Sequence, residues 1–374
     1  MSGLSRGIAG GGKEGKWKRK HGPGWEDGRV VHRQDPPSLD ELLELARVVA
    51  IPTRTRFRGI SVREAVLFDA PNGASEFSPF PEYGDADAAT WLAAAIEFGW
   101  GELPPVSRDR IAVNATVPAV DAAAVPGILA HFPGSRTVKV KVAEPGQSFA
   151  DDVARVRAVR ESLGEEALIR VDANGGWTVE EAEEALRTLD AVTRTDSGGE
   201  DGGLEYAEQP CATVPELAEL RRRLRERGIK VRIAADESVR RAQDPLAVAR
   251  AGAADLLVIK AQPLGGIARA RDIVARAGLP VVVSSALDTS VGIAMGLHLA
   301  AALPEGALAG ACGLGTVALL DGDVTAESLL PAGGALRVRR PALDPALLER
   351  FAATADRTAW WRTRIANSYA LLPL

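Results

Sequence analysis

The stretch from residue 137 to residue 316 decides the fold, because charged residues recur there at the ends of short apolar runs. The runs are TVKVKV (137–142), LIRVDAN (168–174), LEYAEQP (204–210), VRIAADES (231–238) and LLVIKAQ (256–262). They carry Lys141, Asp172, Glu208, Asp236 and Lys260, at successive steps of 31, 36, 28 and 24 residues. Each step is about the length of one βαβ unit. Parallel strands would therefore bring these side chains to one common end, where α/β barrels keep their active sites.

Eight strand-like segments separated by helical stretches predict a (β/α) barrel of the TIM type. The segments are IAVNAT (111–116), TVKVKV (137–142), ALIRVDA (167–173), LEYAE (204–208), VRIAAD (231–236), DLLVIK (255–260), PVVVSS (280–285) and AGACGLG (309–315). Helical periodicity is clear between most of them, as in residues 149–164 and 214–228. The stretch TRTDSGGEDGG (193–203) has no periodicity and is predicted to be a surface insertion.

The chain divides into four parts by composition and pattern. Residues 1–37 are rich in Gly, Lys and Arg and are predicted to be a disordered extension. Residues 38–108 contain a capped helix, three antiparallel strands and a second helix (89–100), which predicts a small α+β capping domain. The barrel follows over 109–322. Residues 323–374 are expected to pack back against the capping domain and complete it.

Composition favours a soluble enzyme that acts on a small molecule. The 374 residues carry a net charge of −5 with both signs spread along the chain, which argues against a nucleic-acid partner. The two cysteines exclude a disulfide framework, and no apolar run reaches the length of a membrane span or a signal peptide. We therefore expect a cytoplasmic protein without a membrane partner. Either a monomer or a homo-oligomer fits this composition.

Three carboxylates on consecutive strands predict a metal site. Asp172, Glu208 and Asp236 would converge from neighbouring strand ends, and their hard oxygen donors suit Mg²⁺, with Mn²⁺ as a possible substitute. Glu237 points to the other side of its strand by alternation, so it is interpreted as a supporting group.

Lysines flank this expected metal site on both sides. Lys139 and Lys141 share one face of the second strand, and Lys260 ends the sixth, across the barrel. A carboxylate substrate on the metal would present its α-carbon to Lys141 on one face and Lys260 on the other. Lys141 must be neutral to act as a base, and burial near Lys139 and the cation would lower its pKa. A salt-bridged barrel lysine is the less favoured alternative for Lys260.

A turn with three arginines could contribute from the capping domain. The stretch TRTRFRG (53–59) contains Arg54, Arg56 and Arg58 and is predicted to be a loop between the first two strands. It is either a solvated hairpin end or a lid that presents cations, Arg56 among them, to an anionic substrate. The four histidines lie in the tail or in helices and match no catalytic position, so they are interpreted as structural or solvated.

The order and spacing of KVKV, RVDANGGW, EYAEQP, AADES and IKAQPLGG resemble the enolase superfamily, in its muconate-lactonizing branch. This resemblance implies an α/β fold, an enolase-like modified TIM barrel with a smaller N-terminal α+β capping domain. The further motifs RVVAIPTRTRFRGISVREAVLF, SEFSPFPEY, SSALDTSVG and GLGT resemble the o-succinylbenzoate synthase family of the actinobacterial type.

The resemblance implies a hydro-lyase of menaquinone biosynthesis. Its reaction removes water from 2-succinyl-6-hydroxy-2,4-cyclohexadiene-1-carboxylate in a syn sense, through an ene-diolate, and yields 2-succinylbenzoate. Lys141 would be the base and then the acid, Lys260 would stabilise the anion from the other face, and Lys139 would tune Lys141. The implied metal ligands are Asp172, Glu208 and Asp236. Further expected substrate contacts are Arg56, Arg170, Asn174, Ser284, Ser285 and Gly313.

Several other activities use the same or a similar constellation. Two opposed lysines also suit an N-acylamino acid (N-succinylamino acid) racemase, and a muconate-type cycloisomerase shares the metal and the lysines. A dipeptide epimerase is disfavoured because ACGLGT (311–316) offers no acid for a substrate ammonium. A Schiff-base aldolase at Lys260 would leave the three acids without a role. A non-catalytic binding barrel is disfavoured because all ligands and both lysines are present.

Overall fold

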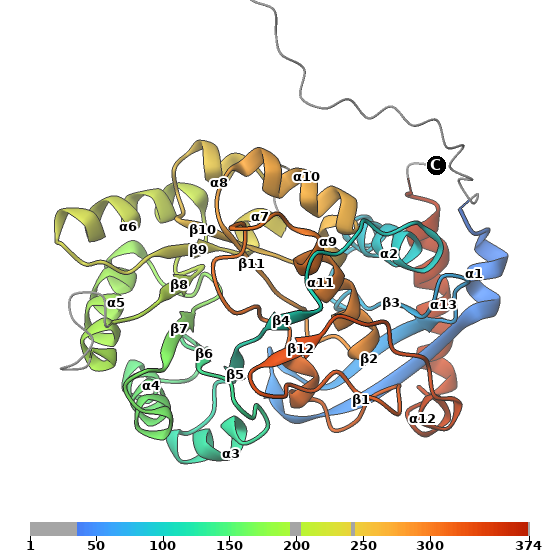
Figure 1. The fold of residues 1–374 in the computed structure, drawn as a ribbon, viewed down its shortest axis with the longest axis horizontal. Coiled ribbons are helices and arrows are strands. Elements are labelled where there is room, and N and C mark those ends of the chain that lie inside the picture. Colours follow the sequence, from blue (N-terminus) through green and yellow to red (C-terminus); the bar gives the residue numbers. More distant parts are fainter. Residues whose placement is uncertain (1–35, 195–202, 241–243, 373–374) are drawn as a thin grey trace, which may run out of the picture. The chain divides into compact units, whose positions relative to one another are not determined.

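The computed structural model describes residues 36–194, 203–240 and 244–372. Its centre is a curled sheet of seven parallel strands in the order β11-β10-β9-β8-β7-β6-β5 (Figure 1). The strands are β5 (Ala115–Val117), β6 (Thr137–Lys141), β7 (Leu168–Asp172), β8 (Tyr206–Glu208), β9 (Ile233–Ala235), β10 (Leu256–Ile259) and β11 (Val281–Val283). Strand order follows chain order, as right-handed βα repeats require. The expected α/β barrel class with an N-terminal capping domain is confirmed.

The eighth predicted strand is not a regular strand. The backbone of residues 308–313 pairs with the sheet through isolated bridges, from Leu308 to Val281, from Cys312 to Val113 and from Gly313 to Ser284. They join the two edges of the sheet, but the segment AGACGLG has few side chains that could pack on a pleated surface. Gly310 also has a φ of 139°, which interrupts extended pairing. The first predicted barrel strand is likewise divided, into β4 (Arg110–Ala112) and β5.

Helices and short turns follow the strands, and the longer helices cover the outer face of the sheet. They are α3 (Val125–Leu129), α4 (Phe149–Leu163), α5 (Val179–Thr193), α6 (Val214–Glu226), α7 (Glu237–Arg240), α8 (Ala247–Arg250), α9 (Ala261–Leu264), α10 (Ile267–Ala277) and α11 (Ser290–Ala302), with the 3₁₀ turns η1 (Ala122–Ala124) and η3 (Thr316–Leu319). Ser148, Thr178 and Thr213 each complete a capping box at the start of a helix. These reciprocal bonds fix where α4, α5 and α6 begin.

The capping domain is an antiparallel sheet, β1 (Ala46–Phe57), β2 (Ile60–Phe68) and β3 (Ser75–Phe77), packed with α1 (Leu39–Leu45) and α2 (Asp85–Trp100). The prediction that residues 53–59 form a loop is wrong. Strand β1 continues to Phe57, and only Arg58 and Gly59 make the turn. The alternation of Thr and Arg in this stretch suits a strand with one solvated face.

The C-terminal segment contributes to both parts of the molecule. Strand β12 (Ala335–Arg337) pairs with β4, and α12 (Pro345–Arg350) and α13 (Ala355–Tyr369) follow it. Trp361 of α13 is fully buried and meets the Phe77 ring edge-on, with centroids 5.8 Å apart. Its indole Nε1 donates to Glu64 of β2 over 3.0 Å. Helix α13 therefore closes the core of the capping domain.

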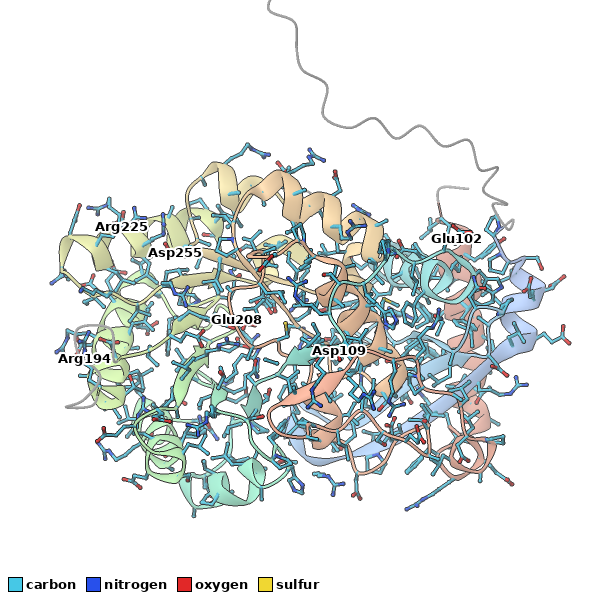
Figure 2. All side chains as sticks on the ribbon, viewed as in Figure 1. Glu102, Asp109, Arg194, Glu208, Arg225 and Asp255 are labelled. Carbon is cyan, nitrogen blue, oxygen red and sulfur yellow. The ribbon has the colours of Figure 1, made fainter. Side chains whose placement is uncertain are left out.

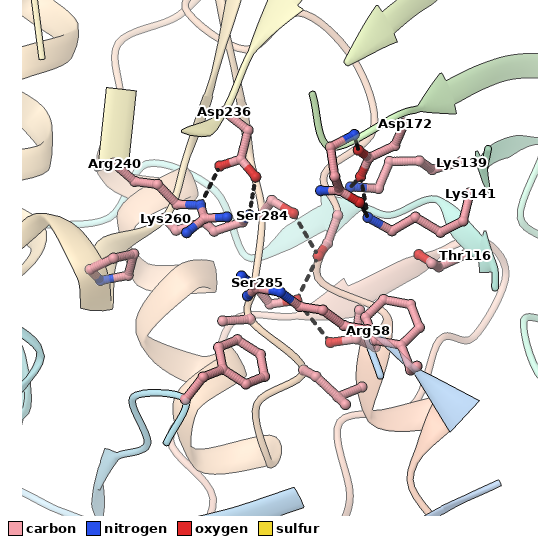
Figure 3. Close-up of a pocket in the computed structure, with 18 of the residues that line it drawn as sticks. Arg58, Thr116, Lys139, Lys141, Asp172, Asp236, Arg240, Lys260, Ser284 and Ser285 are labelled. Carbon is pink, nitrogen blue, oxygen red and sulfur yellow. Dashed lines mark hydrogen bonds and ion pairs between the residues drawn. The ribbon is translucent and has the colours of Figure 1, made fainter. Parts of the chain in front are cut away.

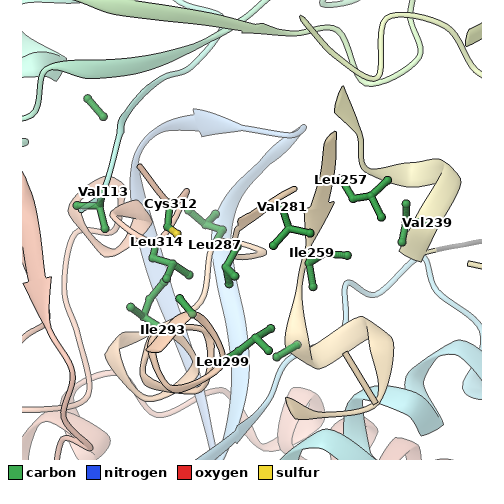
Figure 4. Close-up of a cluster of buried hydrophobic side chains, with 14 of the residues drawn as sticks. Val113, Val239, Leu257, Ile259, Val281, Leu287, Ile293, Leu299, Cys312 and Leu314 are labelled. Atoms are coloured by element: carbon green, nitrogen blue, oxygen red, sulfur yellow. The ribbon is translucent and has the colours of Figure 1, made fainter. Parts of the chain in front are cut away.

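A continuous apolar core lies between the sheet and its helices. Figure 4 shows the part of it that Val113, Ile259, Val281, Ile293 and Leu314 form beside β10, β11 and α11. None of the described helices combines the length and apolarity that a membrane crossing requires. The extension predicted over 1–37 and the insertion predicted over 193–203 fall almost wholly outside the described residues.

Candidate active site

Polar side chains fill the inner face of the sheet at its carboxyl end. Strand register places Lys141 beside Asp172, and Asp172 beside Glu208. Each of these residues ends its strand, and Asp236 directly follows β9. Glu208 lies in the middle of the sheet, whereas Arg194 and Arg225 lie on the periphery (Figure 2). The structure thus brings the predicted charged groups to one end of the barrel.

The lysines form two groups on opposite sides of a pocket (Figure 3). On one side, Lys141 Nζ donates to Asp172 Oδ2 over 2.6 Å and to Asn174 Oδ1 over 2.6 Å. Lys139 Nζ lies 3.0 Å from the same Asp172 oxygen. It also donates to both oxygens of Glu208, over 3.0 and 3.1 Å. The cation-bearing side chains of β6 are therefore held by the acids of β7 and β8.

On the other side, Asp236 joins two cations. Its Oδ2 accepts from Lys260 Nζ over 2.5 Å, and its Oδ1 accepts from Arg240 Nε over 3.0 Å. Lys260 directly precedes the short helix α9, so the end of β10 fixes its direction. The opposed placement of Lys141 and Lys260 that strand order predicts is present in the structure.

Burial makes the charges of this site interdependent. Asp172, Glu208 and Asp236 are each 1% exposed. Burial and repulsion by Asp172 raise the pKa of Glu208 to about 7. Burial would also raise the pKa of Asp172, but Lys141 and Lys139 hold it below its ordinary value. Burial lowers the pKa of Lys260, whereas Glu208 and Asp172 outweigh burial and raise the pKa of Lys139. Lys139 is thus a permanent cation close to Lys141.

The three carboxylates suit a hard divalent cation in donor type and in charge. Two of them contact Lys139 and one contacts Lys260, so ammonium groups now supply the positive charge that these buried acids need. Among the described residues, no three His, Cys, Asp or Glu side chains are arranged to hold a metal ion as they stand. A cation at this position would therefore require the lysines and carboxylates to rearrange.

Four of the six predicted substrate contacts line the pocket: Asn174, Ser284, Ser285 and Gly313. Ser285 Oγ donates to the Gly313 carbonyl over 2.8 Å and also contacts Thr316 Oγ1 at 2.8 Å. The free volume of the pocket is about 40 Å³, roughly that of one water molecule. An adjoining cavity of about 620 Å³ shares Lys141 and Asn174 with it. A larger ligand would have to extend into this cavity or displace the side chains between the two.

The other two predicted contacts, Arg56 and Arg170, do not line the pocket itself. Arg56 lines the adjoining cavity and not the pocket. Arg170 is fully buried inside the barrel, where it forms a bidentate ion pair with Glu205 and donates to Asn114 and to the Ala311 carbonyl. With its guanidinium directed at these groups, Arg170 braces the barrel interior and does not reach the pocket.

Several pocket residues were not assigned as individual substrate contacts from the sequence. Arg58, at the tip of the β1–β2 turn, lines the pocket together with Tyr83 of the capping domain and Arg240 of α7. The ring of Phe57 lies 5.7 Å from Lys141 Nζ. Arg240 stands four residues after Asp236, which was the only sequence signal for their contact. No pattern in the sequence indicates that Tyr83 lines the pocket, because its position depends on how the capping domain packs on the barrel.

Two family descriptions match the chain. Residues 129–342 match "Enolase C-terminal domain-like" and residues 48–99 match "Enolase N-terminal domain-like". Among solved structures, the 2-chloromuconate cycloisomerase of Rhodococcus opacus shares 25% identity at a TM-score of 0.67, covering 83% of this chain and 98% of that one. The N-succinyl Arg/Lys racemase of Bacillus cereus has a TM-score of 0.66 at 18% identity, over 83% of this chain and 97% of that one, and supports the fold alone.

Closer relatives identify the branch. The o-succinylbenzoate synthase of Mycolicibacterium smegmatis is 55% identical over 336 residues, which are 90% of this chain and 98% of that protein. The o-succinylbenzoate synthase of Mycobacterium tuberculosis is 56% identical over 336 residues, 90% of this chain and 97% of that protein. The chain therefore belongs to the enolase superfamily and, within it, to the o-succinylbenzoate synthase family.

Proposed function

We propose that this chain dehydrates 2-succinyl-6-hydroxy-2,4-cyclohexadiene-1-carboxylate to 2-succinylbenzoate, a step of menaquinone biosynthesis. One observation carries the proposal: Lys141 and Lys260 face a single pocket from opposite walls, beside three buried carboxylates. This arrangement occurs in a chain that is 55% identical to an o-succinylbenzoate synthase over nearly its whole length. The activity is that of a hydro-lyase with a small carboxylate as its substrate.

Lys141 is proposed as the base and then the acid. Its neutral amine would take the proton from the carbon next to the substrate carboxylate, and the electron pair left behind would pass into that carboxylate. The anion would then expel the ring hydroxyl, which takes the same proton from Lys141 and leaves as water. The amine is regenerated, and both bonds break on the face that Lys141 occupies. This accounts for a syn elimination.

Lys260 is proposed to stabilise the anion from the opposite face. Its Nζ lies next to Asp236, so the ammonium is held against the wall of the pocket by a short charge-assisted bond. A cation fixed in a buried site interacts more strongly with developing negative charge than it would in water. Lys139 stays charged because it is paired with Glu208 and Asp172, and it places a fixed positive charge beside Lys141.

A divalent cation, which we propose to be Mg²⁺, would be held by Asp172, Glu208 and Asp236. When bound, it would supply electrophilic stabilisation of the substrate carboxylate. The burial of all three carboxylates at neighbouring strand ends supports this assignment, because buried acids need nearby cations to balance their charge. Mn²⁺ would be the natural substitute, since it also prefers oxygen ligands.

A second candidate activity follows from the same two lysines. Because they face both sides of one pocket, they could exchange protons on the two faces of an α-carbon, which is the requirement for an N-succinylamino acid racemase. A muconate-type cycloisomerase would use the same groups. The two alternatives differ from the dehydratase in their substrates, so direct assays separate them.

The test is ultraviolet-monitored turnover of the cyclohexadiene substrate, with and without EDTA, in the wild-type chain and in Lys141→Ala. We expect metal-dependent dehydration that the substitution reduces by at least about 10³-fold, because it removes the group proposed to carry the proton on that face. Lys230→Ala is the matched control, since Lys230 is exposed and outside the pocket. Racemisation of an N-succinylamino acid without dehydration would overturn the substrate assignment and retain the lysine roles.

A further inference from the structure

Arg240 connects a proposed metal ligand to the rest of the pocket. Its Nε donates to Asp236 Oδ1 over 3.0 Å, while the other carboxylate oxygen accepts from Lys260. The Arg240 side chain is only 4% exposed, so no bulk water competes for that bond. Arg240 on Oδ1 and Lys260 on Oδ2 together fix the plane of the Asp236 carboxylate. Its Oδ2 therefore faces Lys260.

The same guanidinium reaches the capping domain. Its Nη1 donates to the Tyr83 hydroxyl over 2.6 Å, and that hydroxyl also accepts from Arg58 Nη2 over 3.2 Å. Arg58 stands at the β1–β2 turn and stacks on Phe80, with its guanidinium carbon 4.3 Å from the ring centroid. A continuous path of contacts therefore runs from the end of β9 to the tip of the cap, and Figure 3 shows its first step, from Asp236 to Arg240.

The third nitrogen of the Arg240 guanidinium bonds to a residue of the barrel. Its Nη2 donates to Glu237 Oε1 over 2.5 Å, and the same oxygen accepts from Asn174 Nδ2 over 3.2 Å. The planar guanidinium of Arg240 thus donates to three separate acceptors, on Asp236, Glu237 and Tyr83. A lysine could keep the charge but could not hold all three acceptors in these directions.

We propose that Arg240 is a positioning residue that orients Asp236 for divalent-cation binding and couples that carboxylate to the capping domain through Tyr83. The inference rests on the metal site of the proposed function. Groups that orient a metal ligand typically change metal affinity by 10- to 100-fold when they are substituted. Linkage then requires that a cation on Asp236 should steady the tip of the cap, and that the cap should in turn strengthen cation binding.

The first experiment measures Mn²⁺ affinity by electron paramagnetic resonance of the free ion, without substrate. Arg240→Lys is expected to bind Mn²⁺ about 10-fold more weakly than the wild type, because it retains the charge and loses the fork. Arg221→Lys is the matched control: Arg221 forms a comparable pair with Asp255, which binds the backbone at the opposite end of β9. Equal affinity in the wild type and Arg240→Lys would overturn the proposal. A wild-type chain that takes up no Mn²⁺ would instead refute the metal site itself.

The second experiment reads the coupling by amide hydrogen exchange of residues 52–60. Mn²⁺ is expected to slow exchange there in the wild type and to lose most of this effect in Tyr83→Phe, which removes only the bridging hydroxyl. Slowing of the same size in both proteins would overturn the coupling. Absence of slowing in the wild type at saturating Mn²⁺ would overturn it as well, because the cap would then be indifferent to the cation.

Discussion

Glu76 provides a pH-dependent test of how the capping domain is held to the barrel. It is fully buried on β3 and accepts four hydrogen bonds, from Ser78 Oγ, from the amide and hydroxyl of Thr289, and from the amide of Gly292. Burial and the nearby Asp288 nevertheless raise its pKa from 4.5 to about 7. Folding therefore increases the proton affinity of this carboxyl.

The sign and size of the effect follow from linkage. Because the folded-state pKa of Glu76 is the higher one, its contribution to stability is complete below pH 4.5 and is lost as pH rises through 7. A shift of this size corresponds to about 3 kcal/mol. Burial also raises the pKa of Asp288, so the two carboxyls titrate as a pair and share this loss.

The perturbation is Glu76→Gln, which keeps the shape and removes the titration. We expect the free energy of unfolding of the wild type to fall between pH 5 and pH 8 more steeply than that of the variant, by about 2–3 kcal/mol in total. The variant should be less stable at pH 5, because one amide NH₂ would face a backbone donor. Urea unfolding at constant ionic strength measures both, with Glu161→Gln as an exposed control. Parallel pH profiles for wild type and Glu76→Gln would refute the reasoning.

Three further outcomes are expected. Lys260→Ala should lower turnover at least about 10²-fold while Mn²⁺ still binds, measured by single-turnover kinetics and Mn²⁺ titration; unchanged turnover would remove Lys260 from the mechanism. Arg170→Met should lower the free energy of unfolding by about 3 kcal/mol, because the Glu205 carboxylate loses its bidentate partner and keeps only the longer ion pair with Arg232, and should leave KM unchanged; a raised KM with unchanged stability would restore Arg170 as a substrate contact. Trp361→Ala should lower the free energy of unfolding, measured with urea, by about 3–5 kcal/mol. A loss under 1 kcal/mol would contradict the placement of α13 in the capping core.

The sequence was most informative where strand position alone determines direction. Lys141, Asp172 and Glu208 each end a short apolar strand, so period-two alternation and a common strand end were sufficient to place them together. Alternation did not predict the structure of the glycine-rich eighth segment, residues 309–315. Its pattern marks a position in the barrel, but its lack of side chains leaves only scattered backbone bridges.

The predicted contacts that lie outside the pocket are those whose side-chain direction depends on tertiary contacts. Arg170 shares a face with Asp172, and alternation alone cannot tell that Glu205 holds its guanidinium one layer below the pocket. In the β1–β2 hairpin, Arg56 and Arg58 carry the same charge and differ only in position. Arg58, at the turn with a φ of 50°, lines both the pocket and the adjoining cavity, whereas Arg56 lines the cavity but not the pocket.

Helix α13 has a consequence for biosynthesis. The apolar faces of β2, β3 and α2 leave the ribosome long before Trp361 and Ile365, which cover them in the finished protein. The barrel strands are synthesised between these two segments. The apolar faces of the nascent capping elements therefore stay partly exposed until α13 has been synthesised. Exposed apolar strands in such intermediates promote aggregation and engage chaperones. Chains interrupted before residue 355 are therefore expected to be insoluble even though every barrel strand and every proposed catalytic residue is already present.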